Sequence, residues 1–446
     1  MKSASSQLVL SGTPMVAMSL CTSTSMHRGG LRLMPAQRFG SALGASIRSS
    51  LDGQGKSGAG VFARALCFVV VGIGSASRAR SWCSIYEHHL GRNRGSRGTR
   101  CAAAASFRPG ALIEDSLDTS LAPRLRAAIS VVTEAGKLTK SLQARVVAGG
   151  LDAQKEDDSV VTVGDFAAQA LVLSRLALEF PDDGFIAEEA SEGLRSQPEL
   201  LAEVLKIVTS ASDGAVASEQ ELCAAIDLAA KGSVGQFTWV LDPIDGTRGF
   251  KNGEQYCIGL GLLDRGSPVL GVLGCPNDHS EHGRLFFAVR GAGAHAATPL
   301  LAAEGVDFKE SRIQVSSRAS ASENIPHAIL LEGPFTDHAR NNRVQKALGS
   351  TTTPLRLDSM VKYGRLAAGE GDLILRLCKG GYREHIWDHA AGAVIVEEAG
   401  GCITDQNGKP LDFSLGKDLS EGVRGIIASS GGDLHPAALE ALHSLD

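Results

Sequence analysis

The sequence lacks three features: a long hydrophobic run, a paired cysteine motif and, over its first 110 residues, acidic side chains. One apolar run, ALCFVVVGIG at residues 65–74, is much shorter than the roughly 20 apolar residues that cross a bilayer. No other stretch approaches that length, so we expect no membrane span. The nine cysteines are dispersed, without C-x-x-C or zinc-type spacing. This pattern favours buried thiols in a reducing compartment over a disulfide framework.

The scarcity of acidic residues divides the chain in two. Residues 1–110 hold 14 Lys and Arg but only Asp52 and Glu87 as acids, whereas the remaining residues carry more acidic than basic side chains. A basic segment rich in Ser, Ala, Gly and Arg is typical of an organelle transit peptide. We therefore predict a mostly disordered leader that directs the protein to a plastid rather than to a mitochondrion. Two alternatives remain: a basic tail that binds nucleic acid, and a two-step targeting signal in which residues 65–74 form the signal-type segment.

Residues 111–446 show the periodicities of a folded α/β (α+β) body. After Pro123, the apolar residues Leu125, Ile129 and Val132 form a stripe that predicts an amphipathic helix. Further helices are predicted after Asp165, within 192–236, at 343–348 and 361–369, and from Asp388 to the pair Gly400-Gly401. Strands are predicted at 159–163, 185–191, 237–242, 256–263, 268–275, 284–291, 313–317 and 328–333. Glycine-rich turns separate several of these strands, which indicates an antiparallel or mixed sheet.

Five carboxylates stand at the predicted ends of these elements. Asp242 and Asp245 close an apolar strand, Glu188 closes another, and Asp165 and Asp388 lie at helix starts. Side chains at element ends can converge on one cleft, although a lone D-x-x-D is more often a solvated turn. A cluster made only of acids, without cysteine or histidine, suits Mg²⁺ rather than zinc. Because bound Mg²⁺ accepts phosphate oxygens, the pattern indicates phosphoryl chemistry.

Two residues beside Asp245 suit the same chemistry. The hydroxyl of Thr247 can hydrogen-bond a metal-bound water, and Gly246 lets the backbone come close to an anion.

Four motifs together resemble the signature set of the Mg²⁺-dependent, lithium-sensitive phosphatases, the superfamily of inositol monophosphatase and fructose-1,6-bisphosphatase. They are T-x-x-D (162–165), A-E-E (187–189), D-P-I-D-G-T (242–247) and W-D-H-A-A-G (387–392). WVLDPIDGTRGF, YREHIWDHAAGAVIVEEAGG and LDSMVKYGRLAAGEGDLILRL are most similar to one branch, the 3′(2′),5′-bisphosphate nucleotidases. The resemblance covers roughly 112–445. It implies a layered α-β-α-β-α sandwich of two sub-domains, with the metal site in 111–305 and a nucleotide-phosphate pocket in 306–446.

The resemblance also implies a role for each matching residue. Two or three Mg²⁺ ions would be held by the carboxylates of Glu188, Asp242, Asp245 and Asp388 and the carbonyl of Ile244. Asp165 and Thr247 would activate the attacking water. The substrate would be bound by Gly246, Thr247, His338, Ser359, Lys362, Arg376 and Asp388, with Ser359, Lys362 and Arg376 around the phosphate that is not cleaved. A second phosphate does need a cationic pocket away from the metals, and Lys and Arg supply one.

The chain departs from the branch at two positions that bear on base recognition. Phe335 stands near the place of a second histidine beside His338, and Met360 replaces a usual glutamine.

The implied reaction removes the 3′-phosphate of adenosine 3′,5′-bisphosphate to give AMP, and converts 3′-phosphoadenylyl sulfate to adenylyl sulfate. Alternatives are an inositol polyphosphate 1-phosphatase or inositol monophosphatase, and an inactive relative that only binds nucleotide. The Ser, Lys and Arg within 358–376 favour the nucleotide, and the complete set of carboxylates favours an active enzyme. We expect a monomer that takes a small-molecule nucleotide and binds neither nucleic acid nor membrane.

Overall fold

The structure is a computed structural model that describes most of the chain from residue 117 onward. The described residues are 117, 119–149, 152–154, 160–231, 235–278, 282–298, 300–301, 309–334, 336–377 and 382–445. The leader predicted at 1–110 and the departure at Phe335 lie outside them. None of the helices in the described part is both long and apolar enough to cross a membrane.

The described elements include helices and strands along the whole of the described part, as the sequence predicts. In chain order they are α5 (Leu121–Val147), β1 (Asp152–Gln154), β2 (Val160–Thr162), α6 (Val163–Glu179), β3 (Gly184–Ala187), α7 (Ser191–Arg195), α8 (Pro198–Ala211), α9 (Glu219–Ile226), η3 (Ala229–Lys231), β4 (Phe237–Asp245), α10 (Thr247–Lys251), β5 (Cys257–Asp264), β6 (Ser267–Cys275), β7 (Arg284–Val289), β8 (Gly293–Thr298) and β9 (Lys309–Ile313). The chain continues with η4 (Ser322–His327), β10 (Leu330–Glu332), α11 (His338–Ala347), β11 (Leu355–Arg356), α12 (Val361–Ala367), β12 (Leu373–Leu377), η5 (Ile386–Asp388), α13 (Ala390–Glu398), β13 (Cys402–Asp405), β14 (Gly425–Ser429) and α14 (Leu434–His443).

Both large sheets are mixed, which confirms the predicted sheet type. The seven-stranded sheet runs β3-β4-β5-β6-β7-β8-β9, and only its β3–β4 pair is parallel. The five-stranded sheet runs β11-β10-β12-β14-β13, with β10 parallel to both neighbours and β14 antiparallel to both of its own. A separate antiparallel pair joins β1 and β2.

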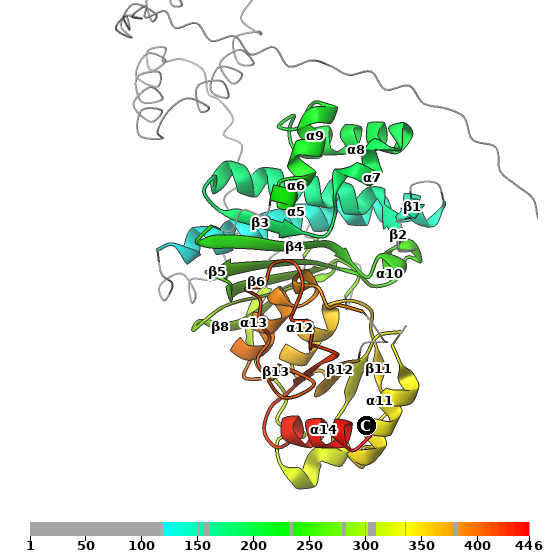
Figure 1. The fold of residues 1–446 in the computed structure, drawn as a ribbon, viewed down its shortest axis with the longest axis vertical. Coiled ribbons are helices and arrows are strands. Elements are labelled where there is room, and N and C mark those ends of the chain that lie inside the picture. Colours follow the sequence, from blue (N-terminus) through cyan, green and yellow to red (C-terminus); the bar gives the residue numbers. More distant parts are fainter. Residues whose placement is uncertain are drawn as a thin grey trace, which may run out of the picture. The chain divides into compact units, whose positions relative to one another are not determined.

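The elements stack in five layers, helices alternating with sheets (Figure 1). Helices α5 and α6 cover one face of the seven-stranded sheet, and α12 and α13 lie between the two sheets. Helices α11 and α14 cover the outer face of the five-stranded sheet. Three separate clusters of buried apolar side chains fill the spaces between these layers. The α-β-α-β-α sandwich that the resemblance implies is therefore confirmed.

The sub-domain boundary at 305 and 306 stays a prediction. The seven-stranded sheet ends with β9, which lies beyond residue 305. The described residues also belong to a single compact unit.

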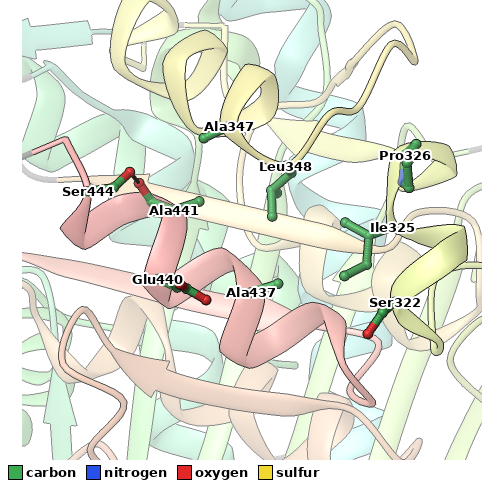
Figure 2. Close-up of a pocket in the computed structure, with 9 residues that line it drawn as sticks. All are labelled: Ser322, Ile325, Pro326, Ala347, Leu348, Ala437, Glu440, Ala441 and Ser444. Carbon is green, nitrogen blue, oxygen red and sulfur yellow. Dashed lines mark hydrogen bonds between the residues drawn. The ribbon is translucent and has the colours of Figure 1, made fainter.

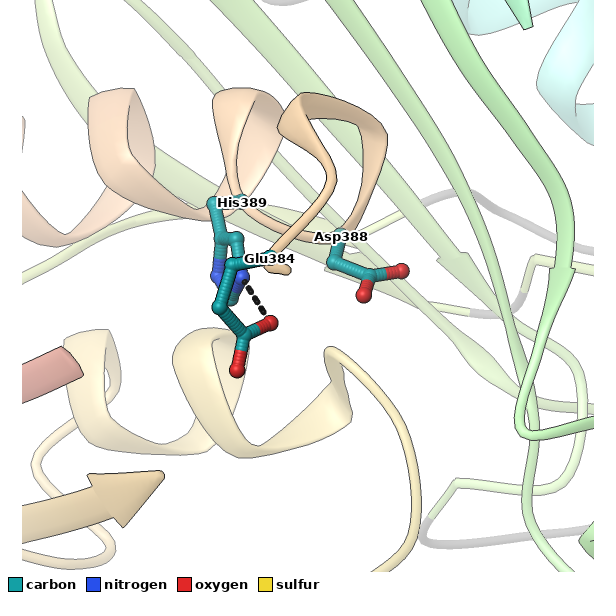
Figure 3. A group of neighbouring side chains, drawn as sticks. All are labelled: Glu384, Asp388 and His389. Carbon is teal, nitrogen blue, oxygen red and sulfur yellow. Dashed lines mark hydrogen bonds and ion pairs between the residues drawn. The ribbon is translucent and has the colours of Figure 1, made fainter. Parts of the chain in front are cut away.

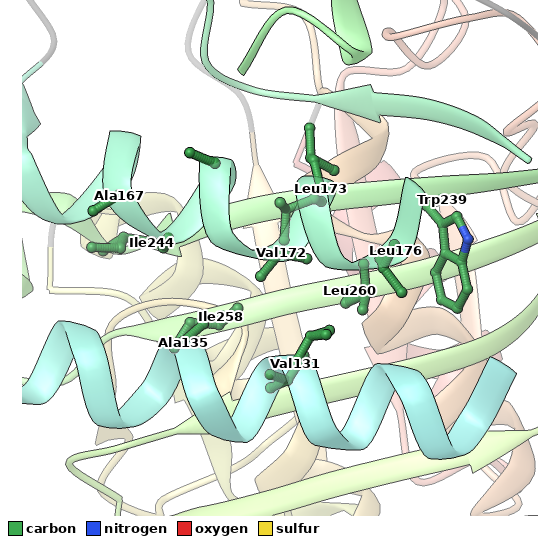
Figure 4. Close-up of a cluster of buried hydrophobic side chains, with 14 of the residues drawn as sticks. Val131, Ala135, Ala167, Val172, Leu173, Leu176, Trp239, Ile244, Ile258 and Leu260 are labelled. Carbon is green, nitrogen blue, oxygen red and sulfur yellow. The ribbon is translucent and has the colours of Figure 1, made fainter. Parts of the chain in front are cut away.

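The largest core joins α5 and α6 to β4 and β5 (Figure 4). Fully buried side chains such as Leu176, Trp239 and Leu260 fill it, and burial of each stabilises the fold by roughly 1.5–3 kcal/mol. The indole of Trp239 donates a hydrogen bond to Asp183 at 3.0 Å, and Arg124 pairs with the same carboxylate at 2.7 Å. The hydrogen bond to Asp183 satisfies the indole N–H, the one polar group of the Trp239 side chain.

Helix α13 approaches the seven-stranded sheet closely because the sheet has glycine beneath it. A Cβ at Gly271 would lie 2.3 Å from the carbonyl oxygen of Ala391, and one at Gly261 would lie 3.1 Å from the Cβ of Ala390. The close contact fixes the start of α13, and with it the turn that carries Asp388, against β5 and β6.

Two predicted helix starts are wrong by a few residues. Helix α6 begins at Val163 with Thr162 as its N-cap, and Asp165 is the third helical residue of a capping box. Asp388 ends the short 3-10 turn η5, and α13 begins only at Ala390. An acidic side chain is stabilising at any position of the first helical turn, so the residue type alone does not show which residue is the cap.

Six described strands were not predicted, namely β1, β8, β11, β12, β13 and β14, and β9 is displaced from its predicted position. Strand β8 has the sequence GAHAAT, in which Thr298 is the one β-branched residue, so its composition is not typical of strands. Strand β12, LILRL, is a short apolar run that fits a helix as well. The strand predicted at 313–317 shares only Ile313 with β9.

Candidate active site

The two aspartates of β4 owe their common direction to an irregularity in the strand. Residues three apart on a regular strand point to opposite faces. The register between β4 and β5 shifts between Asp242 and Asp245, and such a bulge re-aims the side chains beside it. Both carboxylates consequently reach one place. Oxygen atoms of Asp242, Asp245 and Asp388 all lie within 4.8 Å of one another; we call these three residues the carboxylate cluster.

Glu188 reaches the same edge through the parallel pairing of β3 with β4. Ala187 lies opposite Leu241, so the next residue on each strand, Glu188 and Asp242, are neighbours. Burial raises the pKa of Asp242, and the charge of the half-buried Glu188 raises it further. The oxygens of Glu188 do not belong to the group of Asp242, Asp245 and Asp388 oxygens that lie within 4.8 Å of one another. Gln169 of α6 fixes the turn beyond it: its amide donates to the carbonyl of Glu189 at 2.7 Å and accepts from the Glu189 N–H at 3.0 Å.

The carboxylate cluster concentrates negative charge in a buried place. Burial and the charges of Glu188 and Asp245 raise the pKa of Asp242 well above its usual value. Burial and the charge of Asp388 raise the pKa of Asp245 to about 7, although Lys362 and Arg376 act in the opposite direction. Such a group of oxygen donors calls for a cation, because a bound ion offsets the repulsion among the carboxylates. The donor set fits Mg²⁺.

A hydrogen-bonded pair, Asp165 and Thr247, stands beside the carboxylate cluster. The Thr247 Oγ1 atom lies 3.4 Å from Oδ1 of Asp165 and 3.2 Å from the carbonyl oxygen of Ile244. The other oxygen of Asp165 accepts two hydrogen bonds from Thr162, from the backbone N–H at 2.7 Å and from the hydroxyl at 2.6 Å. The buried Asp165 is therefore held from one side and presents Oδ1 to Thr247.

Gly246 brings two distant segments into contact. Its φ of 88° is left-handed, and a Cβ there would lie 3.1 Å from the Cβ of Ser359. Ser359 is itself left-handed, with φ of 63°, a conformation that is strained for a residue with a side chain. The next residue, Met360, donates its backbone N–H to the carboxylate of Asp245. The segment before α12 is thus docked onto the β4–α10 turn.

Two basic residues face the carboxylate cluster from the C-terminal half. The Lys362 ammonium donates to the carbonyl of Ser359 at 2.6 Å and to that of Leu357 at 3.3 Å, and burial lowers the pKa of Lys362. Arg376 of β12 donates to Asp388 at 2.6 Å and pairs with Glu384 at 2.8 Å. Both cations therefore lie at the site, and their assignment to a second phosphate stays a prediction.

His338 lies at the first turn of α11, among residues of its own half. Its Nε2 lies 3.1 Å from the carbonyl oxygen of Pro334 and its Nδ1 lies 2.9 Å from the buried carboxylate of Glu332. Arg356 contacts the same carboxylate at 3.2 Å. The structure gives His338 no contact with the carboxylate cluster, and its role in base recognition stays a prediction.

Sequence reasoning missed a buried group behind Asp388. Glu384 and His389 are joined by a hydrogen bond of 3.0 Å, and Figure 3 shows the Asp388 side chain pointing away from this pair. The imidazole of His389 also bonds the hydroxyl of Tyr363 at 2.8 Å. Glu384 stands four residues before Asp388 in YREHIWD, but nothing in that spacing shows that it pairs with Arg376.

A pocket of about 430 Å³ lies elsewhere, between η4, α11 and α14 (Figure 2). Its lining is Ser322, Ile325, Pro326, Ala347, Leu348, Ala437, Glu440, Ala441 and Ser444. None of the predicted site residues is among them, and the lining lacks the convergent cations or carboxylates that phosphate chemistry needs.

The fold and the carboxylate cluster define a class, which comparison with known proteins identifies. Residues 120–446 match the model of the inositol monophosphatase family, and the chain belongs to that family. A 3′(2′),5′-bisphosphate nucleotidase from Oryza sativa is 38% identical over 345 residues, which cover 72% of this chain and 94% of that protein. One from Emericella nidulans is 38% identical over 309 residues, covering 62% and 85%.

A solved structure shows the same fold. The IMPase from Thermotoga maritima superposes with a TM-score of 0.50 at 23% identity, covering 72% of this chain and 98% of that one.

Proposed function

We propose that this protein is a Mg²⁺-dependent phosphatase that removes the 3′-phosphate of adenosine 3′,5′-bisphosphate, giving AMP and phosphate. The observation that carries the proposal is the carboxylate cluster beside the Asp165–Thr247 pair, in a chain 38% identical to bisphosphate nucleotidases over most of its length. We include 3′-phosphoadenylyl sulfate as a second substrate, which would place the enzyme in sulfur metabolism.

The carboxylate cluster, together with Glu188 and the carbonyl of Ile244, would hold the metal ions. Bound Mg²⁺ offsets the charge of the phosphate and lowers the pKa of a coordinated water. The carbonyl of Ile244 already accepts from Thr247 at 3.2 Å, and its second lone pair is available to a cation. On the resemblance to the lithium-sensitive phosphatases, we also propose that Li⁺ competes for one Mg²⁺ position and inhibits the enzyme.

The Asp165–Thr247 pair activates the attacking water. Because the Thr247 hydroxyl directs its hydrogen to Asp165 or to Ile244, its lone pairs remain to accept a hydrogen bond from water. The water proton passes to Thr247 Oγ1 as the Thr247 proton passes to Asp165. The water oxygen forms the new bond to phosphorus as the bond from phosphorus to the 3′-oxygen breaks. The 3′-oxygen keeps the electron pair of that bond and takes up a proton from solvent water to become the hydroxyl of AMP. Proton transfer of this kind accelerates a reaction by typically about 10²–10⁴-fold.

The second phosphate of the substrate, the 5′-phosphate, binds to Lys362 and Arg376, with Ser359 beside them. Both cations influence Asp245, so they lie next to the cluster rather than on a remote surface. A charge-assisted hydrogen bond from either is stronger than a neutral one and rewards a substrate with two phosphates. An inositol monophosphate has no group for this pocket.

Product identity tests the proposal. Full-length protein with Mg²⁺ and adenosine 3′,5′-bisphosphate should release AMP, separable by chromatography from adenosine 3′-phosphate. Release of adenosine 3′-phosphate would mean that the pocket holds the phosphates in the opposite order. Absence of any phosphate release at saturating Mg²⁺ would refute the proposed activity.

We also propose that residues 1–110 direct the protein to a plastid, and that it acts there as a monomer. Support for the location comes from the basic, acid-poor composition of these residues. Fusion of residues 1–110 to a fluorescent protein should give plastid fluorescence, and diffuse or mitochondrial fluorescence would contradict this location.

A further inference from the structure

The guanidinium of Arg376 lies between two carboxylates of different kinds. Its Nε donates to Oε1 of Glu384 at 2.9 Å, and its Nη2 lies 2.8 Å from Oε2 of the same residue. Nη2 also donates to Oδ2 of Asp388 at 2.6 Å. Asp388 belongs to the carboxylate cluster and Glu384 does not. One arginine is thus shared between a proposed metal ligand and a carboxylate behind it.

Glu384 is held rigidly where it meets Arg376. Its side chain is buried, and its carbonyl accepts the N–H of Leu419 at 2.9 Å. Its carboxylate lies 3.0 Å from Nε2 of His389, whose Nδ1 lies 2.8 Å from the hydroxyl of Tyr363. Since a carboxylate only accepts, Nε2 of His389 carries the hydrogen, and in the neutral imidazole Nδ1 accepts from Tyr363. The network runs from α12 to the metal ligand.

Two interactions compete for the carboxylate of Asp388, the proposed coordination of a cation and the contact with Arg376. A carboxylate that coordinates a cation must keep an oxygen available, yet an arginine 2.6 Å away competes for that carboxylate. Glu384 supplies a matching negative charge. Its two contacts hold the guanidinium from the side opposite Asp388. We propose that Glu384 is a positioning residue for the metal site: it orients and neutralises Arg376, so that Asp388 stays available to Mg²⁺.

Glu384 is not itself a ligand in this account. Oxygen and nitrogen atoms of Glu384, Asp388 and His389 also lie within 4.8 Å of one another, which resembles a second cation site. Arg376 already pairs with Glu384 at two points, and His389 is bonded on both ring nitrogens. The group therefore supports the ligand from behind, as outer residues of metal sites do.

The test is direct metal binding, without substrate, to the full-length protein. Glu384→Gln keeps the shape and removes the charge, and loss of such a supporting group weakens metal affinity by about 10–100-fold. Titration with Mn²⁺ followed by electron paramagnetic resonance, and with Mg²⁺ by calorimetry, should show a loss in this range. Turnover of Glu384→Gln should recover as Mg²⁺ is raised. The inference rests on the proposed metal site, and a wild-type protein that binds neither ion would refute that site itself.

A matched control is Glu370→Gln. Glu370 likewise pairs with an arginine, Arg284, at 2.6 Å, but it is not part of the network behind Asp388. The metal affinity of the Glu370→Gln variant should equal that of the wild type. Equal affinity in Glu384→Gln and the wild type would overturn the proposal, as would an equal loss in both variants.

A second variant covers the case in which Glu384→Gln does not fold. Glu384→Asp keeps the charge but is one methylene shorter, so it cannot keep its contacts with both Arg376 and His389. We expect measurably weaker metal binding in this variant. Wild-type metal binding in a folded Glu384→Asp variant would contradict the positioning role.

Discussion

Thr247 and Asp165, which lie 82 residues apart in the chain, are joined by a hydrogen bond of 3.4 Å between the first turns of α10 and α6. Asp165 can make this contact because Thr162, the N-cap of α6, occupies its other oxygen. The capping box that starts a helix thereby also orients a carboxylate toward a hydroxyl. A local structural motif and the proposed catalytic arrangement share the same residues.

Thr247→Val should reduce turnover without unfolding the protein. Valine has nearly the same shape but lacks the hydroxyl that accepts the water proton, so kcat should fall by about 10²-fold or more. Thr247→Ser keeps the hydroxyl and should retain most of the rate. Steady-state kinetics at saturating Mg²⁺ measure both. Equal rates in the valine and serine variants would remove Thr247 from the proposed mechanism.

Asp245→Ala should abolish turnover while leaving the fold intact. The substitution removes one of the three carboxylates of the cluster and the acceptor for the Met360 N–H. Phosphate release and circular dichroism report activity and fold separately. Glu199→Gln, on the exposed face of α8, serves as a control with normal activity. Near-normal activity of Asp245→Ala would show that the metal assignment is wrong.

Lys362→Ala should weaken binding only of substrates that carry a second phosphate. A hydrogen bond to a charged group is worth about 1.5–3 kcal/mol, which corresponds to a rise of roughly 10- to 100-fold in KM. Adenosine 3′-phosphate, which lacks the 5′-phosphate, should show little change. Lys346→Ala, at an exposed position of α11, is the control. An equal rise in KM for both nucleotides would show that Lys362 does not contact the 5′-phosphate.

The metal-free protein should lose stability as pH rises from about 4 to about 7. The pKa of Asp245 is raised to about 7 in the folded state, whereas an unfolded aspartate titrates near 3.9. Between these values the folded state holds a proton that the unfolded state has lost, so this contribution is complete below about pH 4 and disappears as pH passes about 7.

Asparagine imitates the protonated form, so Asp245→Asn should show a shallower fall in melting temperature over the same range. Added Mg²⁺ should reverse the trend in the wild type, because metal binds the ionised carboxylate. Thermal melting at several pH values, with a chelator and with Mg²⁺, measures this. If the melting temperatures of the wild type and Asp245→Asn fell equally with rising pH, the proposed titration of Asp245 would be contradicted.

The sequence predicted the central sheet better than its margins, for physical reasons. Strands β4 to β7 are long apolar runs with glycine-rich turns, and both signals are local. Strand β8 is built mainly from alanine and glycine, and it is stabilised by pairing with β7 and β9, which no local pattern reveals. Helix α5 starts at Leu121, which puts Pro123 in its first turn, where proline is tolerated. The N-cap Ser120 makes no side-chain capping bond, so the exact start carries no capping signal.

The site divides in the same way. Motifs located Asp242, Asp245 and Asp388 because their residue types and neighbours are distinctive, and the structure brings these three together. Glu384 and His389 escaped notice since their importance lies in which side chains they meet after folding. The β-bulge in β4 that turns Asp242 and Asp245 to one side also depends on pairing with β5.

The measurement that tests the account most directly is a substrate comparison with the full-length protein and Mg²⁺. We would measure kcat/KM for adenosine 3′,5′-bisphosphate, inositol 1,4-bisphosphate and inositol 1-phosphate. The account predicts a preference for the nucleotide of about a hundredfold or more, equivalent to roughly 3 kcal/mol of transition-state discrimination. A preference for either inositol phosphate would leave the carboxylate cluster as a phosphatase centre and contradict the nucleotide pocket at Lys362 and Arg376.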